Sequence, residues 1–545
     1  MPPFFKYKKQ KGHTDQSKDT RDSENHHVPE LIDPSLSVNL DIIKQKTGHS
    51  SDIIVRTIIT GNTPLHKASV VYVDGLVDTQ AINDSLIEPL QTNHDLLEML
   101  YQQDEVDKFT KEFISLGSVH PVTNWDELFL TLMSGDTIIL IDGSNKAWSA
   151  SAKGGERRSI QEPSVQVSVR GSKESYTESI GTNIAMVRRI ISNPDLWIES
   201  MKIGKVTRTD VSIMYINGIA KTEVVDEVRK RLKRINIDSI LESGYIEQLI
   251  EDQTITPFPT IFTTERPDIT AGNLLEGRVA IFVNGSPDAL LAPALFIGFF
   301  QAVEDYYSRY DIATATRFIR VLAFFISLIG PAAYIAITTF HQEMIPTQLL
   351  IIVAAQRDSV PFPAFVEAII MEIAFEILRE AGIRMPKVIG STISIVGALV
   401  IGQGAIQAGI VSPAMVIVVS ITAIANFATP SYTVAISARL IRFLFMIAAA
   451  VFGFYGIILG FIMLVVHLVS LRSFGVPYMT PLAPFIPKNI GDTLIRTPLW
   501  AEKIRPRLIS SKDNIVREGD HQKPAPPKDR AMKKKNTRKG DQNET

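Results

Sequence analysis

The chain contains no cysteine among its 545 residues. This absence excludes disulfide bonds, thiol nucleophiles, cysteine-ligated zinc and iron–sulfur clusters within the chain. The phosphate-binding Gly-x-x-x-x-Gly-Lys-Ser/Thr loop, the His-Glu-x-x-His zinc helix and the Gly-x-Ser-x-Gly nucleophile elbow are also missing. His341 and Glu343 lie two residues apart, but no third ligand accompanies them, so no metal site is predicted. We therefore expect a protein that is not an enzyme and binds no cofactor.

Long hydrophobic runs are absent from the first half of the chain and frequent in the second. The first 30 residues hold no apolar segment of the signal-peptide kind, so we expect the N-terminal half to stay in the cytosol. Residues 388–427, in contrast, contain no charged side chain. A helix needs about 20 apolar residues to cross a bilayer, and its backbone groups must be paired internally. The second half is therefore predicted to be an all-α multi-pass membrane bundle.

Composition divides the chain into five predicted regions. A disordered lead-in (1–39) precedes two α/β units (40–155 and 156–286), a transmembrane helical domain (287–500) and a basic disordered tail (501–545). Candidate crossings are residues 318–340, 365–382, 388–404, 410–427 and 443–468, whereas 288–302 is expected to be an interfacial or re-entrant helix. The tail has 13 Lys and Arg against 7 Asp and Glu, so we expect it to be solvated or to contact anionic lipid headgroups. Without a folded basic face beside it, no nucleic-acid partner is predicted.

An internal repeat supports the two α/β units. Residues 52–86 match residues 195–229 without a gap, so that Asp52 meets Asp195. Residues 139–144 match 281–286 in the same way. Each match joins a run of β-branched residues to an Asp-Gly or Asn-Gly turn, and Thr79 or Thr222 is expected to cap the helix that follows. The alternative is chance similarity between two strand–turn–helix segments.

The strongest candidate site is an acidic stripe within the membrane half. Glu372, Glu376 and Glu380 are spaced four apart on an otherwise apolar helical pattern, and Glu367 precedes them. At about 100° per residue, such spacing drifts only about 40° per step, so the acids share one face. If the protein forms a ring, each acid becomes a ring of acids that attracts cations. The alternative is that Arg379 and Arg384 satisfy the acids within one chain.

Two further sets of residues are candidates for contact roles. Arg357, Arg379, Arg384 and Lys387 cluster around the acidic helix, and the positive-inside rule places them toward the cytosol. In the soluble half, Arg170, Gly171 and Glu174 lie in a polar, turn-like stretch. That stretch is expected to be either an exposed loop or a contact surface for another subunit.

Several longer motifs resemble one family. Residues 340–347 read FHQEMIPT, residues 378–384 read LREAGIR, residues 265–268 read ERPD and residues 473–478 read SFGVPY. Over about residues 40–500 the chain is similar to the A-subunit family of bacterial spore germinant receptors, the GerA family. One departure is Ser172, where the family usually has proline after Val-Arg-Gly.

The resemblance implies a location and a task. Such proteins lie in the inner membrane of dormant spores and act with a transporter-like B subunit and a lipoprotein C subunit. Nutrient binding then leads to release of monovalent cations. We therefore expect a homo-oligomeric, nutrient-gated cation channel with Glu367, Glu372, Glu376 and Glu380 on the ion path. The alternatives are a membrane scaffold or signal relay that conducts nothing, and a solute carrier.

Overall fold

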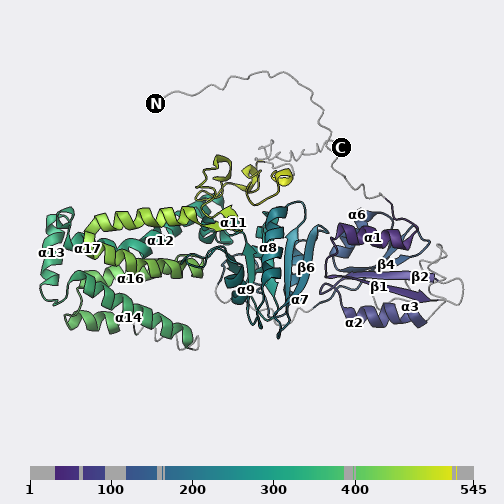
Figure 1. Ribbon diagram of the computed structural model, residues 1–545, viewed down its shortest axis with the longest axis horizontal. Coiled ribbons are helices and arrows are strands. Elements are labelled where there is room, and N and C mark those ends of the chain that lie inside the picture. Colours follow the sequence, from purple (N-terminus) through teal and green to yellow (C-terminus); the bar gives the residue numbers. More distant parts are fainter. Residues whose placement is uncertain are drawn as a thin grey trace, which may run out of the picture.

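The computed structural model describes residues 31–60, 66–92, 118–155, 162–163, 166–385, 397, 400–517 and 523. Three parts follow one another along the longest axis in Figure 1. A first α/β unit, drawn in purple and blue, adjoins a second α/β unit in teal, and a bundle of helices in green lies at the other end. The two α/β units and the helical bundle thus lie in space in the order in which they follow one another along the chain.

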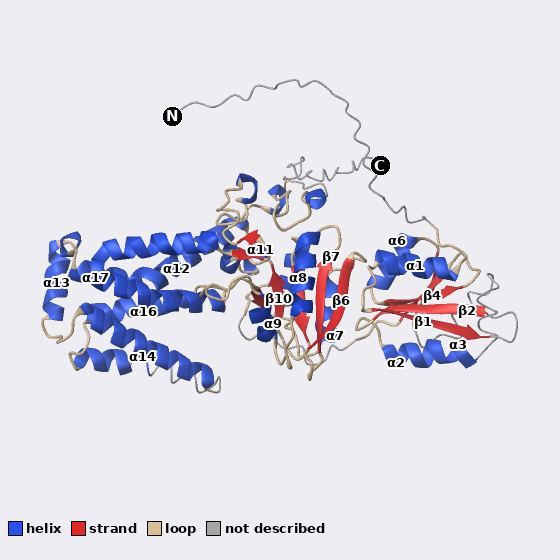
Figure 2. Ribbon diagram, viewed as in Figure 1, coloured by secondary structure: helices blue, strands red, loops and turns tan. Residues whose placement is uncertain are grey.

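The first unit is a five-stranded antiparallel sheet in the order β1-β2-β4-β5-β3. Its helices cover both faces of the sheet (Figure 2), as runs of consecutive buried strand residues require. On β2, Val71 faces the cluster of α1 and α6, whereas Val70 faces α2 and α3. The elements are α1 (Leu36–Lys46), β1 (Ile53–Thr60), β2 (His66–Val73), α2 (Thr79–Ile82) with a π-helical turn (Asn83–Ile87) and α3 (Glu88–Thr92), β3 (Val119–Val122), α6 (Trp125–Met133), β4 (Asp136–Ile141) and β5 (Ala147–Ser151).

The second unit has the same topology, with strands in the order β6-β7-β9-β10-β8. Val70 pairs with Ile139 in the first sheet, and Ile213 pairs with Ile281 at the matching positions of the second. The internal repeat predicted from the sequence is therefore confirmed down to strand register. The elements are α7 (Ile180–Ile190), β6 (Leu196–Ile203), β7 (Thr209–Ile216), α8 (Thr222–Arg234), α9 (Ser243–Ile250), β8 (Phe262–Thr264), α10 (Pro267–Leu275), β9 (Val279–Val283) and β10 (Ala289–Ala292).

The backbone conformation of the two equivalent turns explains why both units of the repeat have glycine there. Gly75 and Gly218 have φ of 76° and 78° at the two equivalent strand–helix turns. A side chain with a Cβ rarely adopts that left-handed conformation. The predicted threonine caps, however, are wrong. Asp78 caps α2 through its carboxylate, which accepts from the amides of Gln80 and Ala81, and no side chain caps α8, because Thr79 and Thr222 already lie inside their helices.

Residues 288–302 do not form the predicted interfacial helix. Residues 289–292 are strand β10, fully buried and hydrogen-bonded between β9 and β8. A 3-10 turn (Phe296–Phe300) follows. A short apolar run reads the same in a buried strand and in a membrane-bound helix, so only the neighbouring strands distinguish the two. The second unit thus extends beyond the predicted boundary at residue 286.

The helical part contains two helices that are long and apolar enough to cross a membrane, within the described residues. These are α12 (Tyr310–Thr339) and α17 (Tyr432–Ser470). Further helices with described bounds are α11 (Glu304–Tyr307), α13 (Thr347–Arg357), α14 (Ala364–Arg384) and the shorter apolar α16 (Pro413–Phe427), and residues 400–407 are helical as well. Most of the predicted crossing at 388–404 lies outside the described residues. Helix α17 is kinked at Gly453, whose φ is 59° and ψ is −140°.

The chain after α17 returns to the second α/β unit, so the start of the predicted disordered tail is in fact ordered. Strands β11 (Arg472–Ser473) and β12 (Val476–Pro477) come first, and the rest carries 3-10 turns at Pro487–Asn489, Leu499–Ala501 and Lys512–Asn514. Ile509 is fully buried in the core of the second unit. Ser511 donates from its amide to the carbonyl of Ile219, 2.9 Å away. The basic composition of residues 501–545 predicted disorder, because it gives no sign of the few contacts, such as those of Ile509 and Ser511, that anchor residues 501–517.

Candidate functional site: an acidic helix and a buried junction

Helix α14 carries all four predicted acids, and their exposure increases along it. The side chains of Glu367 and Glu372 are 0% and 2% exposed, whereas those of Glu376 and Glu380 are 29% and 61% exposed. Figure 1 shows why: the C-terminal end of α14 diverges from α12, α16 and α17. The acidic stripe therefore begins inside the bundle and ends at its surface.

Glu367 is bonded to the start of the next apolar helix. Its Oε2 accepts hydrogen bonds from the amide and hydroxyl of Ser412, at 2.9 and 2.8 Å. Ser412 is the N-cap of α16, where a negative charge is favoured by the helix dipole. Arg357 Nε lies 3.6 Å from the other carboxylate oxygen. The Glu367 carboxylate thus joins α14 to α13 and α16.

Glu372 forms a buried ion pair with a residue from the last helix. Its Oε2 accepts from Arg442 Nη1 at 2.6 Å, and both side chains are almost wholly buried. Arg442 Nε donates in turn to the carbonyl of Ser327 on α12, at 2.6 Å. This chain of bonds ties α14, α17 and α12 together.

The half-buried Glu376 and the exposed Glu380 also have arginine partners. Arg439 Nη1 lies 2.7 Å from Glu376, and Arg379 lies 3.8 Å from the same carboxylate. Glu380 pairs with Arg384 at 2.7 Å on the surface of the helix. Lys387, predicted in the same charge cluster, lies outside the described residues. Arg379 and Arg384 thus pair with acids of their own helix, as the alternative prediction had it. The sequence did not predict the further partners Arg439 and Arg442, which lie on α17.

The polar stretch at residues 170–174 packs against Arg266 and Tyr307. Arg266 Nη2 donates to the carbonyl of Ser172 at 2.8 Å. Gly171 has φ of 125°, and a Cβ there would meet the ring of Tyr307 at 2.4 Å. Arg170 and Glu174 point outward and are exposed. The structure therefore places both charges on an exposed loop, and its use as a contact surface for another subunit stays a prediction.

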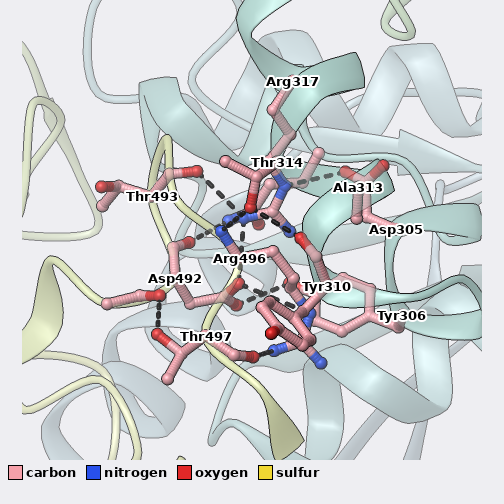
Figure 3. A network of polar contacts seen from close by, with 12 residues as sticks. Asp305, Tyr306, Tyr310, Ala313, Thr314, Arg317, Asp492, Thr493, Arg496 and Thr497 are labelled. Carbon is pink, nitrogen blue, oxygen red and sulfur yellow. Dashed lines mark hydrogen bonds and ion pairs between the residues drawn. The ribbon is translucent and has the colours of Figure 1, made fainter.

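A buried charge network that sequence reasoning missed lies where α12 begins (Figure 3). Arg317 Nε is 2.8 Å from Asp305, and its Nη1 is 2.9 Å from Asp492. Arg320 also binds Asp305, at 2.7 Å. The only sequence signal was a pair of arginines at the start of an apolar helix. Since Asp492 belongs to the C-terminal segment, the network fastens that segment to the base of α12.

Tyr306 completes this junction. Its hydroxyl donates to Asp492 at 2.7 Å, and the Arg496 guanidinium lies over its ring, 4.6 Å from the centroid. Burial, and next the charge of Asp492, raise the pKa of Tyr306 well above its ordinary value. The phenol therefore stays protonated and acts as a donor.

A duplicated α/β region is followed by an apolar helical bundle in which two described helices are long and apolar enough to cross a membrane, which is the architecture of a membrane-associated protein. The chain belongs to the GerA family: the model of the Bacillus/Clostridium GerA spore germination protein matches residues 41–508. This confirms the resemblance drawn from the motifs, and it supports a role in spore germination.

Individual relatives agree over nearly the whole chain. Spore germination protein KA of Bacillus subtilis (strain 168) is 58% identical over 517 residues, which cover 95% of this chain and 94% of that protein. Spore germination protein GerLA of Bacillus cereus is 38% identical over 475 residues, covering 87% and 96%. The crystal structure of the N-terminal domain of the A subunit of the Bacillus megaterium spore germinant receptor GerK3 is 51% identical. It covers 49% of this chain and 98% of that one, with a TM-score of 0.39.

Proposed function

We propose that this chain is the A subunit of a nutrient-responsive germinant receptor in the inner membrane of the spore, with the α/β units in the cytosol. Copies of the chain assemble with one another, and the assembly opens a path for cations when nutrient binds. A transporter-like B subunit and a lipoprotein C subunit are the proposed partners. Family membership supports the role in germination, and the acidic helix supports the path.

The observation that carries the proposal is the surface of α14. Next to the half-buried Glu376 and the exposed Glu380, Ile373 and Ile377 are 48% and 65% exposed. A helix face that is apolar and edged with acids needs a cover of lipid or of a second subunit. In a ring of subunits, Glu376 and Glu380 would form two rings of negative charge, which favour cations. Glu367 and Glu372, which bond to α16 and α17, would fix the position of α14 in the bundle.

The test is cation release from spores after nutrient addition. Glu380→Gln removes an exposed charge whose partner Arg384 is also exposed, so folding should be unaffected. Glu376→Gln is combined with Arg439→Gln, so that Arg439, the nearer of the two arginines beside Glu376, is not left facing a neutral partner. Both variants should slow release at normal protein level. Glu343→Gln, an exposed acid outside α14, is the control and should release cations normally. Unchanged release and ion selectivity in both α14 variants would rule out the path.

A second candidate is a relay that passes no ions. It is favoured by Glu367 and Glu372, whose carboxylates are used inside the chain to join α14 to other helices. Purified protein in liposomes separates the two candidates. A cation conductance that Glu380→Gln lowers supports the channel. Tight binding of a partner subunit without any conductance supports the relay.

A further inference from the structure

A cavity of about 260 Å³ lies between the second α/β unit, the connection into α12 and the C-terminal segment. Asn273 and Arg278 line it from the α/β unit, Tyr307 lines it from α11, and Glu502 lines it from the C-terminal segment. A second cavity shares Arg278 and Glu502. Three parts of the chain that are distant in sequence therefore meet around one space.

Arg278 is the unusual residue of this cavity. It is 5% exposed, and its Nε is buried without a hydrogen-bond partner. Among the described residues its nearest charged group is the Glu276 carboxylate at 3.8 Å, which is too long for a hydrogen bond. Arg442 is also buried and has one nitrogen without a partner, but it forms a close ion pair with Glu372 at 2.6 Å. Arg188 and Arg266 each donate several hydrogen bonds to carboxylates and carbonyls. Within the described part of the chain, no hydrogen-bond acceptor reaches the Arg278 side chain, and a buried donor such as its Nε is costly without one.

The acids around the cavity do not supply that acceptor. Asp268 is bonded to Arg266 and to the hydroxyl of Tyr307. Glu502 is paired with Arg496 and Arg517. Burial raises the pKa of Glu276, and its carboxylate lies 3.8 Å from Arg278, beyond hydrogen-bond distance. The positive charge of Arg278 is thus poorly balanced by its neighbours.

We propose that this cavity binds a small oxyanion, a carboxylate or a phosphate group, on the guanidinium of Arg278. The planar fork of arginine matches both groups with paired hydrogen bonds. The apolar side chains of Phe262, Leu275 and Leu499 line the same cavity and suit an organic part of the ligand. The volume is close to the lower end of the range of about 300–1,000 Å³ for small-molecule sites.

Two sources could supply this group. One is a small soluble anion. The other is the phosphate of a membrane lipid, because Tyr307 lies just before α12, which is long enough to cross a bilayer. In both cases the ligand would hold the C-terminal segment against the α/β unit. Binding should therefore raise the thermal stability of the whole chain.

The test uses the full chain in detergent. Sodium phosphate and sodium acetate are titrated against sodium chloride at matched ionic strength, and the unfolding temperature is recorded. At least one oxyanion should give a saturable rise in the wild type, and Arg278→Met should weaken the apparent affinity at least about tenfold. Arg234→Met removes an exposed arginine from the same unit and should respond as the wild type does. An equal response in Arg278→Met and the wild type would overturn the proposal.

The lipid arm compares nanodiscs of phosphatidylglycerol with nanodiscs of phosphatidylcholine and counts bound lipid by native mass spectrometry. A lipid source predicts retained phosphatidylglycerol that Arg278→Met loses. If Arg278→Met does not fold, Gly298→Val replaces it in both arms. A Cβ at residue 298 would lie 3.6 Å from Arg278 Nη2, so a larger side chain occupies the ligand's place and keeps the charge. No response of the wild type to any probe means that water alone fills the cavity, and the proposal then fails.

Discussion

Arg188 and Asp52 form a two-pronged ion pair across the boundary between the two α/β units. Arg188 Nε donates to Oδ2 and Nη2 donates to Oδ1, both at 3.0 Å, and the two side chains are 0% and 6% exposed. Arg188 Nη1 donates further to the carbonyl of Leu196, at 2.8 Å. The pair therefore fixes the second unit against the first through charges that water does not reach.

Asp52→Asn should destabilise the full chain by about 3–5 kcal/mol, because Arg188 is left buried without its counter-charge. Denaturant unfolding followed by tryptophan fluorescence measures this loss. The repeat supplies the control: Asp195 occupies the matching position and pairs with Lys46 at 3.0 Å, but both side chains are about a third exposed. Asp195→Asn should cost about 1 kcal/mol or less. Equal losses in the two variants would contradict the role of burial.

The Glu372–Arg442 pair makes a similar prediction for the helical bundle. Glu372→Gln leaves Arg442 buried and unbalanced, so the unfolding temperature in detergent should fall, by an amount equivalent to about 3–5 kcal/mol. The double variant Glu372→Gln/Arg442→Gln should lose less than the sum of the single variants, because it leaves no charge unpaired. Additive losses would show that the two residues act separately.

Stability should depend on pH through Glu247 on α9. Burial, and then the charges of Glu251, Glu242 and Asp288, raise the pKa of Glu247 to about 7. An unfolded glutamate titrates at about 4.3. Between these values the folded chain binds the proton and the unfolded chain does not, so stability falls as the pH rises toward about 7 and stays lower above it.

Replacing the carboxylate of Glu247 should remove this loss of stability at high pH. Glu247→Gln should raise the unfolding temperature at about pH 8 much more than at about pH 5, where most folded chains still hold the proton. Glu223→Gln, an exposed acid on α8, is the control and should shift neither value. A gain for Glu247→Gln that is equal at both pH values would contradict the titration of Glu247.

The kink of α17 depends on Gly453. Its φ of 59° is unfavourable for any side chain, and a Cβ there would lie 2.8 Å from the His341 ring. Gly453→Ala should therefore destabilise the bundle by about 1–3 kcal/mol, measured by thermal unfolding in detergent. Gly404 has nothing within 4 Å of the place of its Cβ, so Gly404→Ala should be neutral or stabilising.

Much of the soluble half followed from local pattern. Apolar runs of β-branched residues predicted β2, β4, β7 and β9. The repeat predicted two similar α/β units, and the pairings of Val70 with Ile139 and of Ile213 with Ile281 show that their sheets share one register. Turn glycines such as Gly75 were also predictable, because the requirement for positive φ acts on one residue at a time. The GerA family was recognisable from the sequence because each of its motifs is a contiguous stretch of residues.

The partners of buried charges were decided by tertiary structure alone. The four acids of α14 were visible in the sequence, yet Glu372 meets Arg442 from another helix, and Arg317 meets Asp492 from a segment far along the chain. The return of Ile509 into the second core was equally hidden. Periodicity within one segment determines which face a residue occupies, but which charge it meets there depends on how distant segments pack. A buried ion pair forms only between groups that the fold has brought together and shielded from water.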